Sequence, residues 1–294
     1  MKRKGFSAFL AMAILATVTV FSSCEKMVTD EESVEDRDMS TVTLRASLYN
    51  IVAFGTRAVQ DIKEYCSHIT FAVYDADGKV VKTVEQSQGD SGYGEVTLTL
   101  APATYKLLVL AHSSYGGTPS VTTPANIAFT NSIGYSDTFY YYNDLEVTGK
   151  NQALTLELQR AVTMLRFTIN DELPSDLTKI RCQWSGASGT LNATTGWGGN
   201  ATDQVAIYAV DGLTAPLTLR LYTFMRQETG TLNLTVNAYD SSNNVIAERT
   251  FTDVPVKNHM VTDFSGNFFS KGESDYSISL KAETEWGVYQ DLTF

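Results

Sequence analysis

The sequence predicts an all-β protein built from antiparallel sandwiches. Runs of alternating apolar and polar residues recur from Thr41 onward, for example TVTLRASLYNIV and HITFAVYDADGKVVKTV. This period-two pattern is typical of strands with one buried face. Turn signals separate the runs, and Thr56–Tyr65 is the only candidate for a short helix after residue 24. Closely spaced strands with turns between them favour antiparallel sandwiches over βαβ units.

The strand candidates divide into two sets of about seven, the number expected for one small sandwich each. We therefore predict domains at residues 41–158 and 159–270, followed by tail strands in 271–294. The boundary falls near Leu158–Arg160, where one alternating run leads almost directly into the next. Such a short junction indicates domains that pack closely. Both halves also contain a strand, an Asp-containing turn and a second strand (VYDADGKVV and NAYDSSNNVI), which indicates a duplication.

The first 24 residues have the features of a secretory signal. A cationic start at residues 2–4 precedes a mostly apolar run, Phe6–Phe21, and Ser22-Ser23-Cys24 closes it. The segment is too short and wrongly flanked for a permanent membrane span. Its end resembles the bacterial lipobox, which implies signal cleavage between Ser23 and Cys24 and diacylation of that cysteine. The alternative is an ordinary signal peptide, residues 1–23, with a fortuitous cysteine after it.

Residues 25–40 contain seven acidic residues and no aromatic residue. This composition cannot form a core, so we expect residues 24–40 to be a flexible, lipid-anchored tether. The formal net charge is −11, and it becomes −14 when the three cations of the signal are removed. Such an acidic chain is not expected to bind nucleic acid or to adhere to anionic lipid by charge. Membrane attachment then depends on acyl chains.

Catalytic motifs are missing from the sequence, which has no GxSxG, HExxH, P-loop or Rossmann pattern. The three histidines are isolated, so we expect no metal site, no cofactor and no enzymatic activity. The glycine-rich segment Thr194–Asn200 is predicted to be a loop or hairpin. Asp171 and Glu172 precede Pro174, and we expect a solvated turn there rather than an acid–base pair.

Two cysteines remain besides Cys24. Cys66 and Cys182 lie in apolar, strand-like contexts in different predicted domains. This context favours buried free thiols, although a disulfide is the alternative in an oxidising compartment.

Four motifs together resemble the fimbrillin superfamily of type V pili, and in particular its lipoprotein anchor subunit. The lipobox SSC is followed by HITFAVYDADGKVVKTV, LQRAVTMLRFTI and VPVKNHMVTDFSGNFF, in the order expected for the family. The resemblance implies two tandem transthyretin-like Greek-key sandwiches. It also implies a palmitoylated, surface-exposed lipoprotein of the outer membrane at the base of a fimbrium, with pilin subunits as partners.

Pilins of this superfamily are thought to polymerise by strand exchange, in which a protease removes the first strand and a neighbour's C-terminal strand fills the groove. In this chain the candidate first strand is Thr41–Ala53, followed by Arg57. We expect an anchor to keep that strand, because cleavage after Arg57 severs the lipid from the fold. The candidate donor strands are Tyr276–Ala282 and Trp286–Leu292 in the tail. Their candidate site residues are Tyr276, Ile278, Leu280, Trp286, Val288 and Leu292. Alternatively, the tail strands only close the second sandwich.

A second hypothesis is a surface lipoprotein adhesin that binds a host glycan or protein on the same fold. Its candidate contacts are the exposed rings of Phe139–Tyr142, together with Trp184 and Trp197. Aromatic rings of this kind can stack on sugars, but in an alternating strand half of them are expected to face the core.

Overall fold

A computed structural model describes residues 39–52, 56–113, 119–129, 135–270 and 277–282. These residues form an all-β structure, as predicted. The only helical element among them is a 3-10 turn, Ile62–Glu64. The helix candidate at Thr56–Tyr65 is therefore wrong, because its first half pairs as a strand and only its second half turns.

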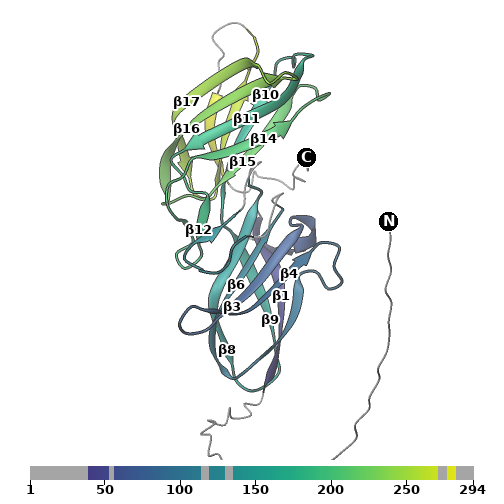
Figure 1. Ribbon diagram of the computed structural model, residues 1–294, viewed down its shortest axis with the longest axis vertical. Helices are drawn as coiled ribbons and strands as arrows, with labels where there is room; N and C mark the ends of the chain where they lie inside the picture. The colour runs from purple at the N-terminus through teal and green to yellow at the C-terminus, as the bar shows by residue number, and fades with distance from the viewer. Residues whose placement is uncertain (1–38, 53–55, 114–118, 130–134, 271–276, 283–294) are drawn as a thin grey trace, which may run out of the picture. The chain divides into compact units, whose positions relative to one another are not determined.

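The first half of the chain contributes one eight-stranded sheet (Figure 1). Its strands are β1 (Ser40–Val52), β2 (Thr56–Gln60), β3 (His68–Tyr74), β4 (Val80–Ser87), β5 (Glu95–Leu100), β6 (Ala103–His112), β8 (Thr138–Val147) and β9 (Gln152–Arg160). The order is β2-β1-β9-β8-β6-β3-β4, and β5 pairs with β1. β8 and β9 pair at only two positions, so the sheet folds over between them. The core therefore lies between the β1, β5 and β9 layer and the β3, β6 and β8 layer.

The second half forms two four-stranded sheets, in the orders β15-β10-β18-β19 and β14-β11-β16-β17. The strands are β10 (Thr163–Ile169), β11 (Leu177–Ser185), β14 (Gln204–Ala209), β15 (Leu217–Thr223), β16 (Thr229–Asp240), β17 (Val245–Lys257), β18 (Met260–Gly266) and β19 (Ser277–Ala282).

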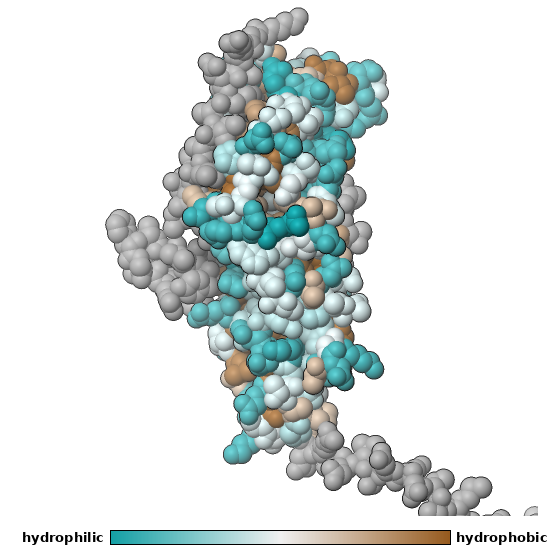
Figure 2. Space-filling view, turned by 90° about the vertical axis from the view of Figure 1, so that its left-hand side faces the viewer, coloured by the Kyte–Doolittle hydropathy of each residue, from teal (hydrophilic) through white to brown (hydrophobic). Residues whose placement is uncertain are grey.

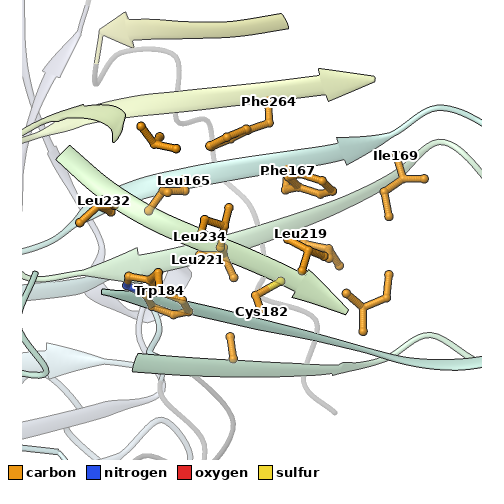
Figure 3. Packing of buried hydrophobic residues seen from close by; sticks show 14 of the residues in the cluster. Leu165, Phe167, Ile169, Cys182, Trp184, Leu219, Leu221, Leu232, Leu234 and Phe264 are labelled. Carbon is orange, nitrogen blue, oxygen red and sulfur yellow. The ribbon is translucent and has the colours of Figure 1, made fainter. Parts of the chain in front are cut away.

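Alternating side chains from these two sheets build a common core, which Figure 3 shows. Phe167 of β10 and Phe264 of β18 are fully buried, with their ring centroids 5.7 Å apart. Cys182 and Trp184 of β11 approach from the facing sheet. Each side chain of this size contributes about 1.5–3 kcal/mol when it is buried. The apolar residues at alternate positions, which predicted the strands, are thus the residues that form this core.

Both halves repeat one pairing scheme over seven strands. β1 pairs antiparallel with β5 and parallel with β9, and β10 pairs in the same senses with β15 and β18. β3 lies between β4 and β6 as β11 lies between β14 and β16. β8 extends β6 as β17 extends β16. By this scheme β9 corresponds to β18. The domain limits at residues 158 and 270 remain a prediction.

The two Asp-containing turns are alike in geometry but do not correspond in this repeat. Asp75 accepts hydrogen bonds from the backbone N–H groups two and four residues ahead, and Asp240 does the same. However, Asp75 directly follows β3 whereas Asp240 is the last residue of β16, and β3 corresponds to β11. The sequence similarity around them therefore reflects a shared turn type, and the repeat is visible in the strand pairing instead.

Short strands inserted into the repeat join the two halves. β7 (Ile127–Ala128) comes from the first half, and β12 (Thr190–Asn192) and β13 (Trp197–Gly198) come from the second. They form one sheet in the order β13-β12-β7. A buried cluster containing Tyr74 and Leu110 from one half and Phe224 from the other lies beside this sheet. The close packing predicted from the short junction is confirmed by these contacts.

The glycine-rich segment is the β12–β13 hairpin, as predicted. Gly196 has a positive φ of 79°, and a Cβ there would lie 2.3 Å from the Tyr140 hydroxyl oxygen of the first half. A Cβ on Gly198 would lie 2.6 Å from the Ser188 Cβ and 2.8 Å from the Phe224 carbonyl oxygen. The glycines therefore allow close backbone approach at the junction rather than phosphate binding.

We predict that Gly198→Ala lowers the free energy of unfolding by about 1–3 kcal/mol, because the added methyl group has no room beside the Phe224 backbone. Urea denaturation measures the change. Gly89→Ala is the matched control, since a Cβ there meets nothing within 4 Å. Equal unfolding midpoints for the two variants would contradict the close approach.

Candidate strand-pairing site

The predicted first strand is a central strand in the structure. β1 pairs with β9 over Val42–Leu48 on one edge. On its other edge it pairs with β5 over Ser40–Arg45 and with β2 over Leu48–Val52. Its side chains Val42, Leu44 and Leu48 are buried, with at most 2% exposure. Removing β1 would therefore expose unpaired backbone on two neighbours and an apolar groove between the layers.

Arg57 lies in β2, directly opposite Ile51 of β1. A cut after Arg57 falls within the strand that forms a hairpin with β1, so β1 would lose its covalent link to the rest of the fold. Residue 53, at the end of the predicted first strand, lies outside the described residues.

The predicted tail strand is present as β19, which includes Ile278 and Leu280. β19 pairs antiparallel with β18, from Ser265 opposite Ser277 to Met260 opposite Ala282. It thus extends the second half of its own chain. The other predicted site residues lie outside the described residues: Ser23, Cys24, Tyr276, Trp286, Val288 and Leu292.

A carboxylate fixes the chain where it leaves β18 toward the tail. Asp171 accepts hydrogen bonds of 2.7 Å from the backbone N–H groups of Phe268, Phe269 and Ser270, and one of 2.9 Å from the Ser270 hydroxyl. Burial acts to raise the pKa of Asp171, but the hydrogen bonds outweigh it and hold the pKa below its ordinary value. Asp171 lies in a bend, and its carboxylate binds partners 97–99 residues away in sequence, which the sequence did not predict.

The LQRAVTMLRFTI motif places two arginines in ion pairs. Arg160 donates from its Nε and one terminal nitrogen to the two carboxylate oxygens of Asp137, both at 2.7 Å, and its side chain is only 9% exposed. The same guanidinium lies 4.8 Å from the centroid of the Phe139 ring. Arg166 pairs with Asp263 at 2.8 Å between β10 and β18. The sequence identified the motif but not its carboxylate partners.

The VPVKNHMVT motif shapes the turn between β17 and β18. His259 has a positive φ of 57°, which lets the chain reverse within two residues. Thr262 donates from its hydroxyl to the Pro255 carbonyl oxygen at 2.9 Å. The Thr163 hydroxyl, at the start of β10, donates to the Lys257 carbonyl oxygen at 2.7 Å. This motif therefore holds β18 beside β10.

The rings proposed for ligand binding are mostly engaged in packing. Trp184 is 1% exposed in the second core, so its proposed role as a stacking ring is wrong. Phe139 and Tyr140 are buried, and Tyr141 and Tyr142 are half-buried against opposite clusters. On the face in Figure 2, hydrophobic residues of the described part appear only as scattered spots.

The described part of the chain contains two of the three cysteines. Cys66 and Cys182 are buried thiols, as predicted, and burial raises the pKa of the Cys182 thiol. Among the described residues, no three potential metal ligands gather. In the same residues, no helix has the length and apolar character needed to cross a bilayer.

The sequence motifs described above form ion pairs, a turn and strand contacts within the fold. The chain belongs to a family of unknown function, DUF6562, whose model matches residues 34–291. No curated protein matches the chain.

Several solved structures are similar to it at low identity. One is described as an adhesin, from Bacteroides ovatus, with 13% identity and a TM-score of 0.49; the match covers 80% of this chain and 88% of that one. A tip fimbrial protein from Porphyromonas gingivalis matches with 11% identity and a TM-score of 0.43, covering 82% and 99%. A fimbrial anchor protein from the same organism matches with 12% identity and a TM-score of 0.42, covering 82% and 95%.

We predict that Asp171→Ala lowers the free energy of unfolding by about 1–3 kcal/mol at neutral pH, because the N–H groups of buried Phe268, half-buried Phe269 and exposed Ser270 lose their acceptor. The folded-state pKa lies below the ordinary value of 3.8, so this stabilisation is present above that pH and disappears as the pH falls through the folded-state pKa. Urea denaturation at a series of pH values from 7 down to 2 measures it. Glu172→Ala is the control; a difference from the native protein that persists at low pH would argue against the carboxylate as its source.

Proposed function

We propose that this protein is an anchor or accessory subunit of a type V fimbrium, attached to the outer membrane through lipidated Cys24 and joined to a pilin by β-strand pairing. The observation that carries the proposal is the position of β1. The tether that follows Cys24 leads directly into a strand paired on both edges, so the lipid and the core are parts of one continuous chain.

Lipid attachment supplies the membrane half of this function. Each buried CH₂ of an acyl chain contributes roughly 0.8 kcal/mol, so two chains such as palmitate hold a protein firmly. The acidic tether keeps the fold away from an anionic surface. On this basis we place the protein at the base of the fimbrium, facing outward from the outer membrane.

Strand pairing supplies the other half. An incoming strand satisfies backbone groups at a sheet edge and buries alternate side chains, which is the physics of β-augmentation. We assign the donor role to the tail, through Ile278 and Leu280 of β19 and through Trp286, Val288 and Leu292. The partner class is a pilin of the same fimbrium. Affinity purification of the tagged full-length lipoprotein from cells tests this assignment: recovery of a major pilin supports it, and recovery of the lipoprotein without any pilin opposes it.

An adhesin on the same fold is the second candidate. Tyr141, Tyr142 and Trp197 keep part of their rings exposed. Binding of the purified protein to a glycan array or a host protein, without a fimbrial partner in pull-downs, would favour this function over the first.

We predict that Cys24→Ala releases the protein, and any fimbriae that it carries, into the medium, because the mature chain then has no acyl chains. Immunoblotting of cell and medium fractions measures the release. Ser22→Ala is the control, since it keeps a small residue before Cys24. Retention of the Cys24→Ala protein on cells would contradict lipid anchoring.

We also predict that deletion of residues 271–294 leaves a folded, membrane-bound lipoprotein that no longer retains fimbriae, because both donor strands are removed. Fimbriae on whole cells are counted by electron microscopy. Deletion of residues 293–294 alone keeps both strands and serves as the control. Fimbriae that stay attached after the longer deletion would exclude the donor role.

A further inference from the structure

In each seven-strand repeat, the first and the last strand lie side by side and run in the same direction. β1 pairs parallel with β9 through the seven residues Val42–Leu48. β10 pairs parallel with β18 through the six residues Met164–Ile169. Because the two strands of each pair are parallel, the chain enters the pair at one end and leaves it at the other end.

A pull on the two ends of a repeat therefore acts along these strands. The chain enters β1 at Ser40 and leaves β9 at Arg160, at the opposite end of the parallel pair. Three residues later it enters β10 at Thr163, and it leaves β18 at Gly266, again at the opposite end of the pair. Tension between residues 39 and 267 would slide β1 along β9 and β10 along β18.

Sliding is the direction in which paired strands resist a pull most strongly. The hydrogen bonds of a parallel pair are evenly spaced along both strands, so a pull from opposite ends loads all of them together. A pull on the same end of both strands loads only the last bond, and the bonds then break one after another. Since forced unfolding is governed by the height of the unfolding barrier, the direction of the pull decides the force that the pair withstands.

Side chains add hydrogen bonds across the first pair. The Ser47 hydroxyl donates to the Leu156 carbonyl oxygen at 3.1 Å, and both residues are buried. The Thr41 N–H donates to the Asn151 Oδ1 at 3.1 Å, directly before the first backbone pair. β1 also pairs with β5 on its other edge. It can slide only if it leaves both of its neighbours.

The second pair has side-chain contacts of the same kind. Arg166 donates from its Nε to the Oδ1 of Asp263, its direct partner in the register, at 2.8 Å, and each side chain is 15% exposed. The Asn170 N–H donates to the Gly266 carbonyl oxygen at 2.9 Å, and its side-chain amide donates to the Ser265 hydroxyl at 3.0 Å. These contacts join β10 to β18 up to the end where the chain leaves the pair.

We propose that the pairs β1–β9 and β10–β18 are two mechanical clamps in series, which keep both halves folded when the protein is pulled between residues 39 and 267. The clamps are a property of the fold. Their use, to carry load from a lipid at Cys24 to a fimbrium, rests on the proposed function.

Single-molecule pulling of the purified full-length chain tests the first clamp. In one chain, Met39→Cys and Gln159→Cys place the two handles at opposite ends of the β1–β9 pair. In a second chain, Met39→Cys and Lys150→Cys place both handles at the same end. All three positions are exposed. The second chain also carries Gln159→Ala, so that both chains lose the hydrogen bond from Gln159 to Tyr140.

The handles attach only at the chosen positions. Cys24→Ala is present in every chain, and Cys66 and Cys182 are buried. We expect the first half to unfold at a force at least about twofold higher when it is pulled from opposite ends than when it is pulled from the same end. Equal forces in the two chains, or a higher force for the same-end chain, would overturn the proposal.

A third chain tests the two clamps in series. Met39→Cys and Asn267→Cys place the handles at exposed positions beyond both pairs. We expect two unfolding steps, each at a force above that of the same-end chain. A step at or below the same-end force would overturn the serial arrangement. Because these chains carry neither lipid nor partner, the clamps can fail while the proposed function stands, and the reverse also holds.

Discussion

The backbone pairing of β1 on both of its edges is the constraint on which the rest of the structure depends. Because β9 runs parallel to β1 and β5 runs antiparallel on the other side, β1 holds one layer of the first half together. Its apolar side chains fill the space between that layer and the β3 and β6 layer. β1 is also the strand nearest to the predicted lipid. If Cys24 is lipidated as we propose, one strand connects membrane attachment with folding.

Insertions into the repeat turn two similar halves into one packed body. Among the residues that the structure describes, the strands β7, β12 and β13 have no counterparts in the opposite half, and they pair with one another across the junction. The Arg160–Asp137 ion pair fixes the short connection between β9 and β10, where a charged, bidentate contact gives orientation as well as energy.

The sequence predicted what depends on local pattern. Period-two alternation identified most strands, and the run of small residues at Thr194–Asn200 indicated a hairpin, because both properties follow from neighbours in the chain. It did not predict contacts between distant residues, such as Asp171 with Phe268 or Arg160 with Asp137. Nor did pattern distinguish Trp184, which is buried, from Trp197, which is half-buried. The local likeness of the Asp75 and Asp240 turns also suggested the wrong correspondence, since turn chemistry is independent of topology.

The central claim is that the lipid and the core stay joined through β1, and the intact mass of the protein recovered from the cell surface tests it most directly. The account predicts a mature chain that begins at acylated Cys24 and continues to Phe294. A chain that begins at Ala58, after cleavage at Arg57, would contradict it, because β1 and the lipid would then both be lost and the open groove would belong to a polymerising pilin.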